Sequence, residues 1–198
     1  MRAEDIRHQV PPADAFGQTN YQRRNPYIYT AGEIVSLLSA AAQLGPCGSF
    51  RPRMYPVLFG LIAATGIRIS EALALKVSDI AEDGLVIRQS KFRKSRLVLL
   101  HSTTQEALRA YLSARAALTT SDDALFVSDS RKVLAISAAE YTFRTLVRSI
   151  GLTGAPDRSN PHIHDLRHNA ERRVIPTRRK KATGRRGSCL REVERRSA

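Results

Sequence analysis

The sequence predicts a mainly α domain with one small antiparallel β-hairpin or sheet, an α+β fold, and three observations support this class. Apolar residues recur at helical spacing in several segments of the chain. Two short apolar runs flank one polar stretch, as in a hairpin. With 198 residues, 42% of them hydrophobic, the chain is long enough for one domain with a core and short appendages.

The first predicted helix begins at a capping-box pattern formed by Thr30 and Glu33. Gly45 is its expected C-terminal stop. The segment Cys47–Pro52 is predicted to be a loop. The apolar positions that recur at helical spacing in this first helix are Ile34, Leu37, Leu38, Ala41 and Leu44.

A second, mostly buried helix is predicted over Met54–Ala64, and Thr65-Gly66 closes it. A short third helix is predicted over Glu71–Val77, after Ser70. We therefore expect Arg68 on the turn between these two helices.

Two strands are predicted over Leu85–Arg88 and Leu97–Leu100. The polar stretch between them, Gln89–Arg96, makes a hairpin with a basic tip that carries Lys91, Arg93, Lys94 and Arg96. In a plainer interpretation, these charges are solvated and only discourage other strands from pairing with the exposed edge of the hairpin.

Three further helices are predicted after the hairpin. Thr103 with Glu106, and Ser137 with Glu140, form capping-box patterns ahead of apolar positions at helical spacing. The brief apolar run 125–127 lies between these two helices. The segment His164-Asp165-Leu166-Arg167 is expected to open the last helix.

Composition divides the chain into three parts: a flexible leader over residues 1–26, a domain over 27–170 and a basic, disordered tail over 171–198. The tail holds 11 Lys and Arg against 3 Asp and Glu, so it carries more than half of the net charge of +14. This charge points to a polyanionic partner, and nucleic acid is the expected one. The tail fits either a genuine DNA-binding extension or a reading frame lost near codon 170.

Several classes of protein are disfavoured by the sequence. The longest near-apolar stretch, Val57–Ile67, is shorter than the roughly 20 residues that a membrane span needs, so we expect no membrane association. Cys47 and Cys189 match neither a metal-ligand spacing nor a disulfide framework. No secretory signal precedes the domain, and the expected location is the cytoplasm.

Some basic residues have the chemistry needed to activate a phosphodiester. Arg68 and Arg167 lie beside predicted helix termini, and guanidinium groups stay charged and bind phosphate in a bidentate way. Lys91 at the hairpin tip suits a general acid for the leaving oxygen. His164, three residues before Arg167, could hydrogen-bond the same phosphate.

Each of these residues also has a plainer interpretation. Arg68 could form an ordinary ion pair with Glu71 across one helical turn. A lone His-x-x-Arg arises easily by chance, as at His164 and Arg167. The order and structural placement of the residues together favour the phosphate-binding interpretation.

Three segments resemble the catalytic domain of the tyrosine recombinases, the phage integrase family. Ala-Thr-Gly-Ile-Arg-Ile-Ser-Glu-Ala-Leu-Ala-Leu is similar to the family's first arginine box and places that arginine at Arg68. Gln-Ser-Lys-Phe-Arg-Lys-Ser-Arg-Leu-Val places the hairpin lysine at Lys91, with Lys94 as the nearby substitute. His-Asp-Leu-Arg-His matches the His-x-x-Arg box at His164 and Arg167.

This resemblance runs from about Asn25 to Asn169 and implies site-specific DNA breakage and rejoining through a 3′-phosphotyrosine, without metal or nucleotide cofactor. Double-stranded DNA would be the partner, in a nucleoid-associated setting, and full-length recombinase subunits a second one. Glu71 would buttress the first arginine. The implied catalytic residues are Arg68, Lys91, His164 and Arg167, and the implied DNA-contacting residues are Arg68, Lys91, Arg93, Lys94, Arg96 and Arg167.

Parts of the family pattern have no counterpart in these 198 residues. The box with a second His or Trp is missing after Arg167, and Tyr141, the last tyrosine, precedes the His-x-x-Arg box. The family's N-terminal helical domain has no room before the match. We therefore expect a truncated or frame-disrupted catalytic domain, incomplete at its C-terminus, that does not cleave DNA alone.

Three alternatives remain open. The first is a non-catalytic DNA-binding regulator or dominant-negative partner of a full-length recombinase. The second is a protein that receives the tyrosine from another subunit. The third is a basic helical protein with no role on DNA.

Overall fold

The computed structural model describes residues 25–88, 95–118, 123–152 and 160–174, and it confirms the mainly α class with a two-stranded antiparallel sheet. In chain order the elements are α1 (Ala31–Ala41), α2 (Arg51–Thr65), α3 (Ile69–Leu73), the 3-10 helix η1 (Val77–Asp79), β1 (Gly84–Ile87), β2 (Arg96–Leu99), α4 (Ser102–Ala116), α5 (Ile136–Ser149) and α6 (Asp165–Val174).

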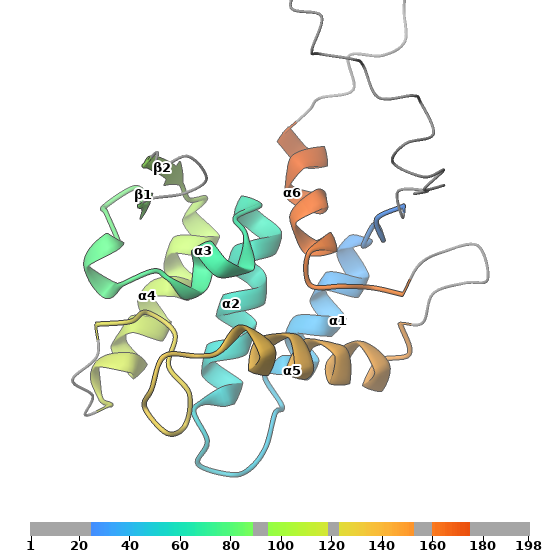
Figure 1. Cartoon of the computed structure of the whole chain (residues 1–198), viewed down its shortest axis with the longest axis horizontal. Coiled ribbons are helices and arrows are strands. Elements are labelled where there is room, and N and C mark those ends of the chain that lie inside the picture. The colour runs from blue at the N-terminus through green and yellow to red at the C-terminus, as the bar shows by residue number, and fades with distance from the viewer. Residues whose placement is uncertain (1–24, 89–94, 119–122, 153–159, 175–198) are drawn as a thin grey trace, which may run out of the picture.

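Helix α2 is the centre of the fold, and α1, α4 and α6 all pack against it (Figure 1). It is apolar on more than one face, as expected of a helix surrounded by others. Phe59 of α2 meets Phe143 of α5 edge to face, with ring centroids 5.4 Å apart. The buried residues of α2 are Met54, Tyr55, Leu58, Phe59, Leu61, Ile62 and Ala63.

The capping box that begins α1 is confirmed. The Thr30 hydroxyl accepts the Glu33 N–H at 3.2 Å, and the Glu33 carboxylate accepts the Thr30 N–H at 2.6 Å. The predicted stop at Gly45 is wrong, because the helix ends at Ala41. Short-range bonds from Gln43 and Leu44 tighten the chain into a turn there, so no glycine is needed to end the helix.

Helix α2 begins at Arg51, inside the predicted loop and three residues before Met54. The Asp129 carboxylate accepts the Phe50 N–H at 2.8 Å and the Ser49 hydroxyl at 2.8 Å, and thereby satisfies groups at this helix start. Pro52 is tolerated because the first turn of a helix has no use for its missing N–H. The predicted closure at Gly66 is confirmed, with φ of 69°.

Helix α3 covers Ile69–Leu73 instead of the predicted Glu71–Val77. It ends early because the chain beyond it pairs with a distant segment. The Leu125 N–H donates to Leu75 O at 2.8 Å, and the Val77 N–H donates to Asp123 O at 2.9 Å. These non-local bonds replace the helical ones.

The predicted capping boxes at Thr103 and Ser137 are wrong, although both helices exist. Helix α4 begins at Ser102, with His101 as its cap, and α5 begins at Ile136 after Ala135. His101 and Ala135 both have extended backbones, so the turn into the helix comes before the expected serine or threonine.

The predicted hairpin is confirmed, with Leu85 opposite Val98 and Ile87 opposite Arg96. A Cβ on Gly84 would lie 2.3 Å from the Val98 carbonyl oxygen, so only glycine fits there. β1 is mostly buried, whereas β2 is mostly exposed. The hairpin therefore lies at one edge of the domain (Figure 1).

The apolar run Leu125–Val127 is fully buried and serves as a connector between elements. The Tyr111 hydroxyl donates to Leu125 O at 2.8 Å, and the Arg115 guanidinium donates to Ala124 O at 3.0 Å. Helix α4 thereby anchors this run against the chain that follows α3. Among the described residues, no helix is long and apolar enough to cross a membrane.

Candidate functional site

Arg68 is positioned as the N-cap of α3, with an extended backbone (ψ of 150°) after the left-handed turn at Gly66. Its backbone N–H donates to Glu71 Oε2 at 2.9 Å, and its Nη1 donates to Glu71 Oε1 at 2.9 Å. The Arg68 side chain stays 37% exposed. The predicted turn position and the ion pair with Glu71 are thus both present, and the guanidinium can reach solvent.

Glu71 is shared between two arginines. Arg96, at the start of β2, donates from Nη1 to Glu71 Oε1 at 3.2 Å and from Nη2 to Oε2 at 2.8 Å. The Glu71 side chain is only 8% exposed. Burial opposes its ionisation, but the hydrogen bonds and charge of Arg96, with the bonds from Arg68, outweigh burial and lower the pKa of Glu71 to about 2. Glu71 is therefore a fixed negative charge that joins the two arginines.

A close approach at Gly66 brings Arg167 to the Arg68 turn. A Cβ on Gly66 would lie 3.6 Å from the Arg167 carbonyl oxygen and 3.8 Å from its Cγ. Arg68 follows Gly66 by two residues, and Arg167 belongs to the first turn of α6. Two predicted site residues from distant parts of the sequence therefore lie on neighbouring elements.

The start of α6 is organised by Asp165, which is 8% exposed. Its carboxylate accepts the His162 N–H at 2.8 Å, and the Arg167 N–H donates to His164 O at 3.2 Å. His164 is exposed on the turn just before the helix, and Arg167 is half-buried. The predicted opening of the last helix by this segment is confirmed.

Asn169 ties α6 to the segment that precedes α1. Its Oδ1 accepts the Tyr29 N–H at 3.1 Å, and its Nδ2 donates to Tyr29 O at 2.8 Å. The Tyr29 hydroxyl donates to His162 O at 3.3 Å. Tyr29 therefore bonds to residues on both sides of the turn that carries His164, from 133 and 140 positions away in sequence.

Three of the predicted DNA-contacting residues, Lys91, Arg93 and Lys94, lie outside the described residues. The stem that carries them is described. Arg88, on one side of the tip, is paired with the buried Asp79, and Arg96, on the other side, is paired with Glu71. The two arginines next to the tip are thus each attached to a buried carboxylate.

Sequence reasoning missed the contacts of Arg96, Asn169 and Asp165. The pair formed by Arg68 and Glu71 has a helical i, i+3 spacing and can be found by inspection. Arg96 is 25 residues from Glu71, and no local pattern relates them. Asp165 lies three residues after His162, a spacing that could have signalled its capping bond.

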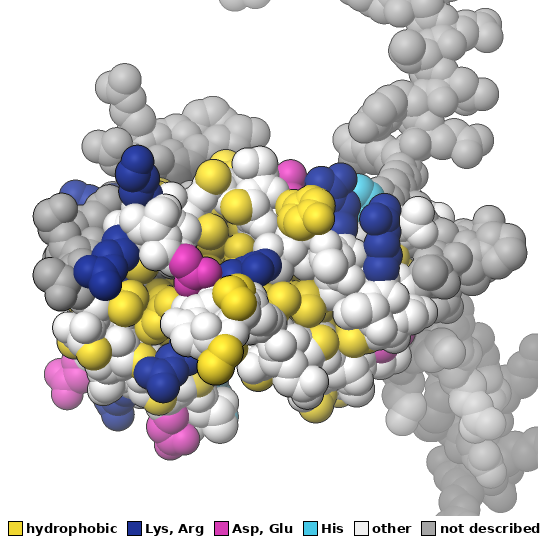
Figure 2. Space-filling model, turned by 90° about the horizontal axis from the view of Figure 1, so that it is seen from below, with side chains coloured by type: hydrophobic (Ala, Val, Ile, Leu, Met, Phe, Trp, Pro, Cys, Tyr) yellow, Lys and Arg dark blue, Asp and Glu magenta, His cyan; other side chains and the backbone are white. Residues whose placement is uncertain are grey.

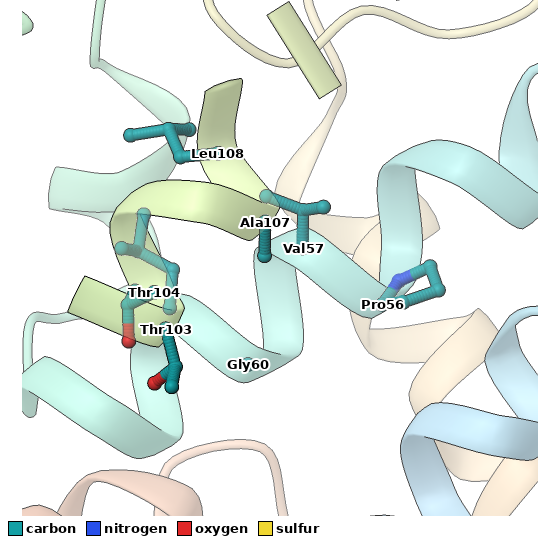
Figure 3. A pocket seen from close by; sticks show the side chains of 8 residues that line it. Pro56, Val57, Gly60, Thr103, Thr104, Ala107 and Leu108 are labelled. Atoms are coloured by element: carbon teal, nitrogen blue, oxygen red, sulfur yellow. The ribbon is translucent and has the colours of Figure 1, made fainter. Parts of the chain in front are cut away.

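An apolar pocket and the charge distribution on one face are two further surface features. An apolar pocket between α2 and α4 contains none of the predicted site residues, and no charged residue lines it (Figure 3). On the face shown in Figure 2, Lys and Arg side chains are dispersed among hydrophobic and acidic ones. Neither feature has the concentrated positive charge that a phosphate backbone requires.

Comparisons with known proteins find relatives over most of the chain. The sequence profile of the Phage integrase family matches residues 28–177. A putative integrase/recombinase, y4rB, of Sinorhizobium fredii is 40% identical over 175 residues, which are 84% of this chain and 55% of the relative. The chain spans about half the length of the curated relatives it matches.

Solved structures show the same fold. The crystal structure of XerA recombinase matches with a TM-score of 0.63 and 26% identity, covering 81% of this chain and 53% of that one. XerH site-specific recombinase bound to its difH substrate, in a pre-cleavage complex, matches with a TM-score of 0.60 and 23% identity, covering 77% and 44%.

Proposed function

This chain belongs to the phage integrase family, and from that premise we propose that its 198 residues bind double-stranded DNA and grip a backbone phosphate with Arg68 and Arg167. The family is that of the tyrosine recombinases, which serve site-specific recombination. The observation that carries the proposal is the approach of Arg167 to Gly66, two residues from Arg68. Two guanidinium groups on adjoining elements suit bidentate contacts with one phosphate.

The remaining predicted roles complete this proposal. Lys91 would protonate the leaving oxygen from the hairpin tip, and His164 would hydrogen-bond the phosphate. Arg93 and Lys94 would contact the DNA backbone beside it. Arg68 keeps more than a third of its side chain in solvent, and His164 is exposed, so both are accessible to DNA.

We do not expect these 198 residues to cleave DNA alone. No tyrosine follows Tyr141, which lies on the exposed face of α5 and is 65% exposed. We propose binding without cleavage, because a covalent intermediate requires a nucleophile in line with the gripped phosphate. A full-length recombinase subunit is the expected second partner, since it could supply that nucleophile. The division into leader, domain and tail, and the cytoplasmic, nucleoid-associated location, stay predictions.

Binding to a fluorescent DNA duplex at increasing salt tests the main proposal. The affinity of the wild type should fall steeply with salt, because phosphate contacts release counterions. Arg68→Gln and Arg167→Gln should each weaken binding and reduce the salt slope by about 1. Arg109→Gln, which removes an exposed arginine from α4, is the control. A flat salt dependence, or equal effects of all three variants, would contradict the proposal.

A nicked duplex that traps covalent intermediates tests the absence of cleavage. The 198-residue protein should bind this substrate without forming a covalent adduct. A full-length relative in which the arginine equivalent to Arg68 is replaced keeps its tyrosine. If that tyrosine can act at the phosphate held by the 198-residue protein, mixing the two proteins should restore adduct formation. An adduct formed by the 198-residue protein alone would overturn this part of the proposal.

A further inference from the structure

The two arginines that flank the hairpin tip are paired with different carboxylates. Arg88 pairs with Asp79 of η1, whereas Arg96 pairs with Glu71, the carboxylate that also binds Arg68. Both carboxylates are nearly buried, with side chains 5% and 8% exposed. Only Arg96, of these two, is therefore connected through a single side chain to a proposed phosphate-gripping residue.

The contact between Arg96 and Glu71 is geometrically specific. Both Glu71 oxygens accept from Arg96, at 3.2 and 2.8 Å, and the same two oxygens accept from the side chain and backbone of Arg68, both at 2.9 Å. A planar guanidinium can satisfy both oxygens at once, which a lysine ammonium cannot do in the same way. Arg96 also pairs with Ile87 across the hairpin.

We propose that Arg96 is a positioning residue that acts through Glu71, holding Arg68 and the stem of the Lys91 hairpin in one fixed unit. This inference rests on the proposed function and changes the role expected for Arg96, which the sequence suggested would contact DNA. Arg96 aligns the Arg68 guanidinium for phosphate, and the same bond sets where the hairpin leaves the domain. Its effect on DNA is indirect and depends on Glu71.

A buried carboxylate with two hydrogen-bonding arginines explains why this arrangement is stable. If Arg96 were absent, Glu71 would keep only Arg68, and Arg68 would have to neutralise a largely buried charge by itself. The arginine would then be drawn toward the protein and away from a phosphate. Arg96 lowers the pKa of Glu71 more than Arg68 does, which is consistent with Arg96 neutralising most of the Glu71 charge.

Duplex binding by a set of variants tests the inference. Arg96→Gln should weaken binding about tenfold more than Arg88→Gln, which removes the same charge from the other side of the hairpin. Arg96→Lys should resemble Arg96→Gln, because charge without the bidentate fork does not hold Glu71. In a Glu71→Gln background, Arg96→Gln should cause no further loss beyond about twofold.

The opposite results would overturn the positioning role of Arg96. If Arg96 contacts a phosphate directly, Arg96→Lys should bind almost as well as the wild type. Arg96→Gln should then also cost as much in the Glu71→Gln background as in the wild type. If Glu71→Gln does not fold, the comparison of Arg96→Lys with Arg96→Gln decides the question on its own.

An NMR titration separates this inference from the proposed function. The Arg68 backbone N–H donates to Glu71, so its chemical shift reports the ionisation of that carboxyl. Arg96→Gln should raise the pKa of Glu71 from about 2 toward its ordinary value of 4.5, and Arg88→Gln should leave it in place. An unchanged titration in Arg96→Gln would overturn the inference, whereas a wild type that binds no duplex would overturn the proposed function.

Discussion

Gly66 lies so close to Ala170 that a Cβ added to the glycine would be 3.2 Å from the Cβ of Ala170. This contact joins the end of α2 to α6. Gly66 is the first residue after α2 and lies two residues before Arg68. Gly66 meets two requirements at this point, a left-handed backbone and the lack of a side chain. The relative placement of Arg68 and Arg167 depends on both.

Gly66→Ala should destabilise the protein more than Gly151→Ala, which is a matched control. Both glycines have left-handed backbones, with φ of 69° and 72°, but nothing lies within 4 Å of the Cβ position at Gly151. The control should cost about 1–2 kcal/mol of unfolding free energy from backbone strain alone. Gly66→Ala should add about 1–3 kcal/mol from crowding and should also weaken duplex binding. Urea denaturation and duplex titration measure the two effects, and equal losses in both variants would contradict the close approach.

Asn169→Ala should lower the unfolding free energy by about 1–3 kcal/mol, because it removes the partners of the N–H and the C=O of Tyr29 in a buried place. Asn25→Ala, at an exposed position, should change it by less than about 0.5 kcal/mol. Urea denaturation of the two variants provides the comparison. Hydrogen exchange at the Tyr29 amide should accelerate in Asn169→Ala only, and unchanged protection there would rule out this bond.

Glu71 should make stability depend on pH in acid. Its pKa is lowered from an ordinary value of 4.5 to about 2 in the folded protein, so the unfolded chain binds more protons between these values. The stability that Glu71 contributes is fully present above pH 4.5 and is lost as pH falls toward 2. Unfolding free energies measured from pH 6 to pH 2.5 should therefore decline.

Glu71→Gln should flatten this decline, whereas Glu106→Gln, at an exposed position on α4, should leave it in place. Part of the slope should persist in Glu71→Gln. Asp79 also has a lowered pKa, since the bonds from Arg88 and Lys76 outweigh the opposing effect of burial. An identical slope in Glu71→Gln and the wild type would show that Glu71 is not held by its arginines in solution.

Tyr111→Phe should cost about 1–2 kcal/mol of unfolding free energy, because it leaves the buried Leu125 carbonyl without this donor. Burial raises the pKa of Tyr111 well above its usual value, as expected of a hydroxyl held away from water. Tyr141→Phe, on the exposed side of α5, is the matched control and should have little effect. Thermal unfolding of the two variants checks this, and equal melting temperatures would contradict the anchoring role of Tyr111.

Much of the fold could be predicted from local sequence signals. The capping box at Thr30 and Glu33, the glycine closure at Gly66 and the hairpin all depend on residues within a few positions of one another. Such patterns predict which segments are helices or strands because the groups that satisfy the backbone are already neighbours in sequence. The ion pair between Arg68 and Glu71 is of the same kind.

The tertiary structure alone decided where several elements begin and end and how the site residues are joined. The bond from Phe50 to Asp129 lets α2 begin before the predicted Met54, and the bond between Leu75 and Leu125 stops α3 before the predicted end. Asn169 docks α6 on Tyr29, and Arg96 reaches Glu71 across 25 residues. No spacing rule encodes these contacts, because a buried polar group bonds to whatever polar partner the packing of apolar faces brings beside it.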